Sequence, residues 1–506
     1  MSNIVIIGGG TAGWLTALYV QKKFPQHNIT VVASSKIGIL GAGEGSTPQF
    51  NEFLKLVDIP IADLLKHTGA TVKNGIKFTN WNGDGEFYYH GFKDHPSVDP
   101  THEKVLDPLK ISPLYLDKIA KNENLDEYDF TSFISENQRV KYSKDTQEKF
   151  GESSLHFNAR ELAKYFETVG VSRGVTVVDD EVSNIVADSD MNITSFALSS
   201  GATLDADFVF DCTGFQRMII GKFYKSQWNT YKHSLPVNRA IPFFIENPTD
   251  NLPPYTESIA MKYGWMWKIP VQGRYGCGYV FNKELVSDED AQKEIEEYLG
   301  HKINPPTVFN FEPGAFEHVW IKNCLAIGLS SGFVEPLEAT SIWVQIQSLE
   351  FFGDKFEEYL QGNPLAVEYV NVNVKRMNDV ILNFIYLHYI TKRTDTEFWT
   401  NFTADNIVPQ GIDYLNKYVK SATIDRYFFD VLLSKMQYIA FGEQSWYAVG
   451  AGVRIFKPEI AKKEFDSLVE DSNYYESLKQ SHLASMQAKS ELLMTHWEYI
   501  RHETAN

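Results

Sequence analysis

The first 32 residues have the pattern of a β-α-β unit, and this pattern constrains the fold more than any other feature. Residues 4–7 are a short apolar run, as expected of a strand buried on both faces, and residues 28–32 form the second predicted strand. Between them, Gly8, Gly10 and Gly13 have GxGxxG spacing, and apolar residues then recur at helical intervals. Such glycines permit a tight turn, close approach of the backbone to a pyrophosphate and close helix–strand packing. The sequence therefore predicts an α/β fold with a Rossmann-type dinucleotide site.

One feature of that fingerprint is missing at the end of the second predicted strand. An Asp or Glu usually binds the ribose there, but this sequence reads Ala33-Ser34-Ser35. Ser34 offers a weaker hydrogen bond in the same place. We expect the departure to affect the ribose contact and to leave the pyrophosphate cradle intact.

Two later segments favour FAD over NAD. Residues 207–215 read as a strand that ends in a tight turn, with Asp211 and Gly214 as candidate contacts. They resemble the second nucleotide-contact motif of FAD-dependent hydroxylase-like proteins. Residues 324–332 form another apolar strand and a Gly/Ser loop, in which Gly328 is followed by Leu329 where aromatic hydroxylases usually have Asp.

The composition excludes several classes of partner. The formal net charge is −18, so no overall basic field attracts nucleic acid or an anionic membrane. Only three cysteines occur, no CxxC pair is present, and no apolar run reaches about 18 residues. No basic segment precedes the first strand, so a signal peptide is not expected. We expect a cytoplasmic protein without a membrane or nucleic-acid partner, and no motif indicates a metal site.

Two tryptophans stand one residue apart in the segment 264–270. In an extended segment, residues two apart point to the same side, so Trp265 and Trp267 would line one wall. Pro270 would end the segment or place it at a sheet edge. Alone, such a segment is more often a core strand. Together with the N-terminal fingerprint, it resembles the flavin-dependent halogenases of the tryptophan-halogenase family.

The segment 332–342 carries this resemblance most specifically. Thr340 or Ser341 suits the N-cap of a helix, and a helix N-terminus can hold an anion through its backbone amides and dipole. The resemblance implies that halide binds at Thr340 and Ser341, and that the functional glutamate of the family maps onto Glu338. Read alone, the segment is an ordinary capped helix with a surface acid.

The resemblance also implies a catalytic lysine, which maps onto Lys77. Strand alternation places Lys77 and Trp81 on the face opposite Phe78. Alone, Lys77 would be a lysine on a solvated face. In a desolvated pocket the pKa of a lysine falls, so a neutral amine becomes accessible. Such an amine could hydrogen-bond hypohalous acid or be halogenated itself.

The implied activity is an FADH2- and O2-dependent halogenation of an electron-rich aromatic small molecule such as an indole or phenol. Halide is oxidised to hypohalous acid, Lys77 positions the halogen, and Glu338 accepts the developing charge or the released proton. Trp265 and Trp267 would separate the flavin from the substrate. Only one dinucleotide fingerprint is present, so a separate flavin reductase would supply FADH2.

Two other functions remain open. One is an FAD-dependent aromatic monooxygenase, against which Leu329 and the tandem tryptophans argue. The other is a non-catalytic flavin-binding protein, against which Lys77 and Glu338 argue. The choice among chloride, bromide and iodide, and the oligomeric state, a homodimer included, are likewise open.

The substrate is less well defined. His90 and Phe92 match a His-x-Phe pair that stacks on the indole in tryptophan halogenases. The lid pattern of those enzymes, however, is absent from residues 424–444. Residues 43–48 resemble the strap between the flavin and substrate sites of the family. The candidate cofactor-binding residues are Gly8, Gly10, Thr11, Ala12, Gly13, Ser34, Gly43, Glu44, Asp211, Gly214, Gly328 and Leu329.

The expected organisation is an FAD-binding, hydroxylase-like module with substrate-wall insertions over residues 1–350. A mainly helical region, 351–506, would cap the substrate pocket.

Overall fold

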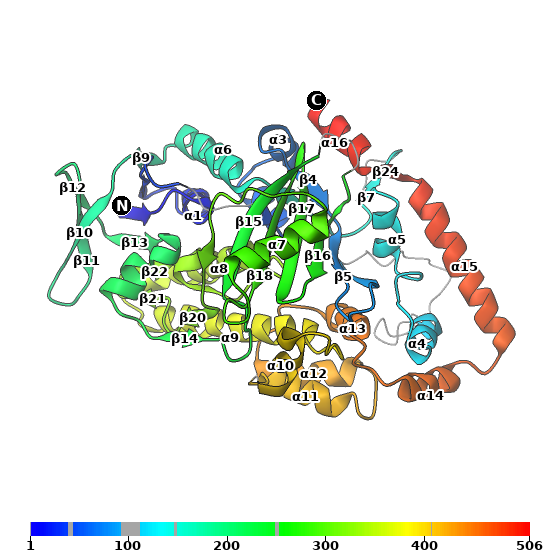
Figure 1. Ribbon diagram of the computed structural model, residues 1–506. Helices are drawn as coiled ribbons and strands as arrows, with labels where there is room; N and C mark the ends of the chain where they lie inside the picture. The colour runs from blue at the N-terminus through cyan, green and yellow to red at the C-terminus, as the bar shows by residue number, and fades with distance from the viewer. Residues whose placement is uncertain are drawn as a thin grey trace. The chain divides into compact units, whose positions relative to one another are not determined.

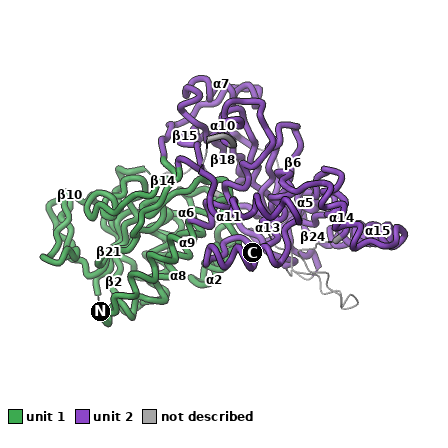
Figure 2. Tube along the Cα trace, turned by 90° about the horizontal axis from the view of Figure 1, so that it is seen from below, with its two compact units in different colours: residues 1–70, 157–231, 312–378 green, residues 71–156, 232–311, 379–506 purple. Residues whose placement is uncertain are grey.

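The computed structural model describes residues 2–38, 44–92, 112–145, 149–247, 252–405 and 407–505. The chain forms two compact units, and each is assembled from three separate stretches (Figure 2). Unit 1 comprises residues 1–70, 157–231 and 312–378; unit 2 comprises residues 71–156, 232–311 and 379–506. The boundary expected near residue 350 falls within a helix, α8 (Ser341–Leu360).

Unit 1 contains the predicted Rossmann-type sheet (Figure 1). Its strand order is β21-β22-β13-β1-β2-β9, and all neighbours are parallel except the pair β21 and β22. The strands are β1 (Asn3–Ile7), β2 (Asn28–Val32), β9 (Thr176–Val178), β13 (Phe208–Asp211), β21 (Trp320–Ile321) and β22 (Cys324–Ala326). The apolar run of β1 is buried, as expected of a parallel strand covered on both faces. The fold class is therefore confirmed.

Helices and shorter strands complete unit 1. Helix α1 (Thr11–Lys23) follows the glycine-rich turn and packs against α6 (Ala159–Ser172) and α8. The remaining elements are β3 (Glu44–Gly45), α2 (Gln49–Leu56), α3 (Ile61–His67), β10 (Val182–Ala187), β11 (Ile193–Leu198), β12 (Thr203–Asp205), η1 (Gly214–Gln216), η2 (Met218–Phe223), β14 (Trp228–Thr230), β20 (Gly314–Phe316), η3 (Gly328–Ser330) and β23 (Gly332–Phe333). Helix α9 (Leu365–His388) continues from unit 1 into unit 2.

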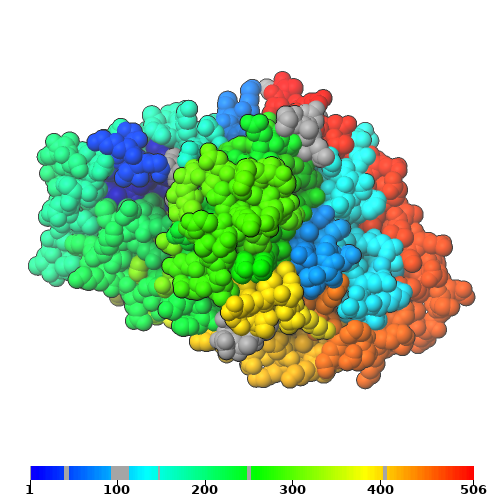
Figure 3. All heavy atoms as spheres, in the orientation of Figure 1, coloured from blue at the N-terminus to red at the C-terminus, as the bar shows by residue number. Residues whose placement is uncertain are grey.

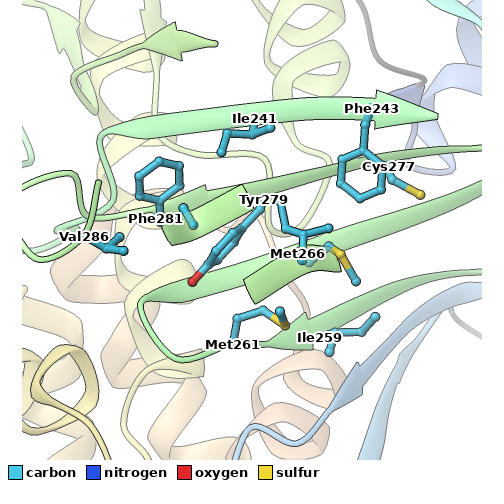
Figure 4. Packing of buried hydrophobic residues seen from close by; sticks show 11 residues of the cluster. Ile241, Phe243, Ile259, Met261, Met266, Cys277, Tyr279, Phe281 and Val286 are labelled. Atoms are coloured by element: carbon cyan, nitrogen blue, oxygen red, sulfur yellow. The ribbon is translucent and has the colours of Figure 1, made fainter. Parts of the chain in front are cut away.

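Unit 2 is built on a seven-stranded sheet of order β19-β15-β18-β17-β16-β5-β6, antiparallel except between β16 and β5. Its strands are β5 (Gly75–Thr79), β6 (Phe87–Gly91), β15 (Arg239–Glu246), β16 (Tyr255–Ala260), β17 (Gly264–Val271), β18 (Arg274–Phe281) and β19 (Phe309–Asn310). Helix α7 (Asp288–Leu299) packs on one face, where Met266, Cys277 and Tyr279 lie in a buried apolar cluster (Figure 4).

The rest of unit 2 is mainly helical, in agreement with the expected C-terminal region. Helices α14 and α15 lie beside α4 and α5 (Figures 1 and 3). The elements are β4 (Thr71–Lys73), α4 (Ser112–Ala120), α5 (Phe130–Glu136), β7 (Arg139–Ser143), β8 (Ser154–Phe157), α10 (Glu397–Asp405), α11 (Gln410–Tyr418), α12 (Arg426–Met436), α13 (Glu443–Gly452), α14 (Pro458–Leu468), α15 (Ser472–Glu491), β24 (Leu493–Thr495) and α16 (His496–Ala505). None of the described helices has the length and apolar character needed to cross a membrane.

Two local expectations were wrong. The strand that contains Pro270 is not at an edge, because β17 lies between β18 and β16 and continues to Val271. Its pairing with β16 ends at Lys268, so the missing N–H of Pro270 interrupts no ladder on that side. Trp81 does not share the face of Lys77, because Asn80 has a φ of 62° beyond the strand end and turns the chain. The Trp81 ring instead packs edge-on against Phe78.

Candidate active site

The three predicted FAD motifs come together in unit 1. They follow β1, β13 and β22, which are adjacent parallel strands, so their loops leave the same edge of the sheet. Ser330 Oγ donates a hydrogen bond to Gly214 O at 3.3 Å, which joins the second motif to the third. A Cβ atom on Gly328 would lie 2.9 Å from the Cβ of Ala12, so the third motif also packs on the first.

The fingerprint glycines divide into two kinds. Gly8 has a φ of +119°, and a Cβ on Gly13 would lie 1.8 Å from Gly8 O, so both are required by the fold itself. Around Gly10, in contrast, a Cβ would meet no heavy atom within 4 Å. Helix α1 starts at Thr11 with no side-chain cap on its amides. Open space at uncapped helix amides fits the pyrophosphate of FAD.

Carboxylates reach the end of β2 from elsewhere in the chain. Ser34 Oγ donates to Glu181 Oε1 at 3.1 Å, and Ser35 N donates to Asp179 Oδ1 at 2.7 Å. Both acids follow β9, which is the parallel neighbour of β2. The sequence reasoning missed Glu181, because only the strand order reveals that residues so distant in sequence share this position.

The carboxylate of Asp211 accepts hydrogen bonds from the turn that follows its own strand. Its Oδ1 accepts hydrogen bonds from Thr213 N and Thr213 Oγ1, and its Oδ2 accepts from Ile219 N and Ile220 N, at 2.6–3.1 Å. The carboxylate is fully buried and holds the turn that follows β13. Any contact with a cofactor here would come from the turn, where Gly214 has a φ of +63°, rather than from the acid.

The predicted halide turn lies at the start of α8 in unit 1. The helix begins at Ser341, and Thr340 occupies the N-cap position without a side-chain cap hydrogen bond. Ala339 has a φ of 54°, which turns the chain sharply into the helix. A cavity of about 20 Å³ adjoins this turn; its lining includes Gly332, Phe333, Thr340 and Ser341.

Glu338 is not a surface acid. Its exposed fraction is 2%, so the reading of this segment as a capped helix with a solvated carboxylate is wrong.

Leu329 of the third motif is half-buried. Thr11 and Ala12 form the first turn of α1. Gly43 lies outside the described residues, and only the backbone of Glu44, at the start of β3, is described.

The tandem tryptophans of unit 2 lie as predicted. Trp265 and Trp267 extend from the same face of β17, with ring centroids 6.1 Å apart and planes at 59°. Trp265 is buried, and Trp267 lies over Gly278 of the neighbouring strand, where a Cβ would come within 2.1 Å of the indole. Gly278 therefore leaves the room that this indole needs.

The strand register places Lys77 on the opposite face from these indoles. Phe78 pairs with Ser258, which pairs with Trp267, so their side chains share one face of the sheet. Lys77 pairs with Glu257 and therefore points to the other face.

Lys77 has an acidic partner that the sequence analysis did not anticipate. Its Nζ lies 2.7 Å from Glu136 Oε1 and 3.9 Å from the ring centroid of Phe87, which places a charged ammonium in an ion pair and over an aromatic face. The Glu136 side chain is 43% exposed, and it also accepts a hydrogen bond from Tyr89 Oη.

A second lysine fits the desolvated environment better. Lys73, on β4, has an exposed fraction of 0%, and its Nζ lies 5.4 Å from the ring centroid of Phe92. Phe92 is the residue predicted to stack on the substrate. Its partner His90 is buried, with its ring 5.3 Å from that of Phe384. The sequence pattern could not rank the lysines, because their burial and their partners are supplied by distant segments.

No group of three or more His, Cys, Asp or Glu side chains within the described ranges could hold a metal ion.

Comparisons with known proteins identify the family of this chain. The sequence profile of a family described as tryptophan halogenase matches residues 3–467. The chain is 31% identical to tryptophan 6-halogenase SttH of Streptomyces toxytricini over 438 residues, which cover 81% of this chain and 82% of that protein. It is also 31% identical to tryptophan 7-halogenase RebH of Lentzea aerocolonigenes over 428 residues, covering 79% and 78%.

Solved structures give the same result. The crystal structure of SttH superposes with a TM-score of 0.83 at 26% identity and covers 99% of both chains. BrvH, a flavin-dependent halogenase from Brevundimonas sp. BAL3, superposes with a TM-score of 0.84 at 25% identity and also covers 99% of both.

Proposed function

Because the chain belongs to the tryptophan halogenase family, we propose that it uses FADH2 and O2 to place halogen on an electron-rich aromatic small molecule such as an indole or phenol. It is a flavin-dependent halogenase, and the proposal concerns its mechanism and substrate class. The observation that carries this proposal is the small cavity at the uncapped start of α8, in the same unit as the three FAD motifs.

We place the halide ion at that cavity because of the helix end beside it. The volume of about 20 Å³ has room for about one water-sized guest, and Glu335 also lines the cavity. The first amides of α8 have no intrahelical acceptor, and the positive end of the helix dipole lies at the same point. Thr340 and Ser341 would therefore hold chloride, bromide or iodide through backbone N–H groups.

The flavin would be held by Gly8, Gly10 and Gly13 at the pyrophosphate and by Ser34 and Glu181 near the ribose. When bound in its reduced form, FAD supplies the electrons with which O2 oxidises halide to hypohalous acid. We infer that a separate flavin reductase provides FADH2, since the chain has one dinucleotide fingerprint. Trp265 and Trp267 would form the wall that keeps the organic substrate from direct hydroxylation.

Lys73 and Lys77 compete for the role of the amine that positions the halogen. Lys73 is fully buried, whereas the Lys77 side chain is 12% exposed and paired with Glu136. Desolvation favours the neutral form of an amine. Lys73 also adjoins Phe92, whereas Lys77 points away from the tryptophan face. We assign the role to Lys73 and keep Lys77, which the sequence pattern favoured, as the alternative under test.

Glu338 would complete the substitution. An aromatic C–H bond is replaced by a carbon–halogen bond. The ring releases a proton, and the hydroxyl group of hypohalous acid leaves as water. A carboxylate that is 2% exposed stabilises the cationic ring strongly and can accept this proton.

The test is turnover with FADH2, O2, halide and a panel of indoles and phenols, read by mass spectrometry. Lys73→Met should abolish the halogenated product while flavin reoxidation continues, and Lys77→Met should retain it. The reverse result would return the role to Lys77. Hydroxylated product formed without halide would instead favour the monooxygenase, and flavin binding without any turnover would favour the non-catalytic protein.

A further inference from the structure

The strand that carries Lys73 is held by two buried histidines. β4 pairs with β8 on one side and is the edge strand of that sheet. Its residues Thr71 and Val72 each contact a histidine, His156 and His496 respectively. We propose that His496 and His156 are positioning residues that fix β4 and thereby aim the amine of Lys73. This inference rests on the proposed role of Lys73.

His496 lies on the side of β4 that has no paired strand. Its Nε2 accepts a hydrogen bond from Val72 N at 2.8 Å, so this nitrogen carries no proton. Nδ1 is then the protonated nitrogen, and it donates to Leu252 O at 2.7 Å. The side chain is 1% exposed, and burial lowers the pKa of His496 to about 4. The neutral imidazole is therefore fixed in one tautomer between two backbone groups.

His156 reaches β4 through a directed chain of hydrogen bonds. Thr71 Oγ1 donates its single proton to Pro270 O at 2.6 Å, so it must accept from His156 Nδ1 at 3.2 Å. His156 Nε2 then accepts from Thr256 Oγ1 at 2.9 Å. The chain runs from β16 through the histidine and β4 to the end of the tandem-tryptophan strand.

Both histidines therefore act on Lys73 through the backbone. His496 is the first residue of α16, so the C-terminal helix is tied directly to β4. A three-residue edge strand has few groups of its own to fix a long, flexible side chain. Displacement of a reacting group by about 1 Å can cost about 10²-fold in rate. Loosening β4 should thus release hypohalous acid unused rather than stop its formation.

Two matched substitutions separate the contacts of His496. The side chain in His496→Gln can still accept a hydrogen bond from Val72 N. The side chain in His496→Asn can still donate to Leu252 O but is too short to accept from Val72 N on β4. In the Asn variant we expect the Val72 amide to exchange hydrogen about tenfold faster or more. Product per FADH2 oxidised should fall about tenfold, with the missing oxidant recovered in a hypohalite trap such as monochlorodimedone. The Gln variant should resemble wild type in both measurements.

Thr71→Val provides a second test that removes one hydroxyl without changing shape. It should also lower product per FADH2 oxidised and raise trapped hypohalite. Unchanged Val72 exchange in His496→Asn would overturn the anchoring, and faster exchange with wild-type coupling would overturn its effect on the reaction. Full halogenation by Lys73→Met would instead refute the proposed role of Lys73, whatever the histidine variants do.

Discussion

Replacement of Gly10 by alanine should weaken FAD binding without weakening the fold. Gly10 has φ −80° and ψ −171°, which alanine adopts without strain, and a Cβ there meets no heavy atom within 4 Å. Loss of glycine from the unfolded chain stabilises a protein by about 0.4–1 kcal/mol when the native conformation is compatible. The added methyl group would occupy the space that we assign to the pyrophosphate. Overlap of this kind costs about 1–3 kcal/mol, or about 5- to 150-fold in Kd.

Thermal unfolding of the FAD-free protein and titration by flavin fluorescence measure the two effects separately. Gly13→Ala is the matched control, because its Cβ would lie 1.8 Å from Gly8 O and the fold itself must move. It should lower both the unfolding temperature and the affinity for FAD. If Gly10→Ala binds FAD within about twofold of wild type, the pyrophosphate does not approach Gly10 and the assigned cradle is incorrect.

Further expectations concern Glu338, His496, Gly278 and the source of electrons. Glu338→Gln should slow product formation by about 10²–10³-fold and leave the rate of flavin reoxidation nearly unchanged. Stopped-flow absorbance of the flavin and quantification of the product measure the two rates separately. A block in flavin reoxidation would place Glu338 at the flavin. Since burial lowers the pKa of His496 from 6.5 to about 4, the unfolded chain binds more protons in this window. The free energy of unfolding should fall as pH decreases through it, by about 3 kcal/mol in total, and urea titrations should show a weaker pH dependence in His496→Gln. Gly278→Ala should displace Trp267, because the new Cβ would lie 2.1 Å from the indole ring. The free energy of unfolding, measured by urea titration, should fall by about 1–3 kcal/mol. No loss is expected for the control Gly38→Ala, because a Cβ there meets no heavy atom within 4 Å. The purified protein should not oxidise NADH or NADPH at enzyme-like rates without an added reductase, and direct oxidation would contradict the single fingerprint.

Local patterns in the sequence were sufficient for the features that depend on neighbouring residues. The β-α-β unit followed from an apolar run, a second predicted strand and the glycine spacing between them. The common face of Trp265 and Trp267 followed from strand alternation. The start of α8 at Ser341 was likewise predicted from the sequence, although Thr340 makes no side-chain cap hydrogen bond there. These features require only the geometry of a few consecutive residues, so they can be read before the fold is known.

Burial, register and strand order were decided by the tertiary structure alone. Pairing of β5 with β16 turned Lys77 away from the tryptophan face, and packing from distant segments desolvated Lys73. The parallel pairing of β2 with β9 brought Glu181 to Ser34. His496 reached β4 across more than four hundred residues. Such contacts depend on which distant segments meet, because the same side chain is solvated or desolvated according to what covers it, and no local pattern records that choice.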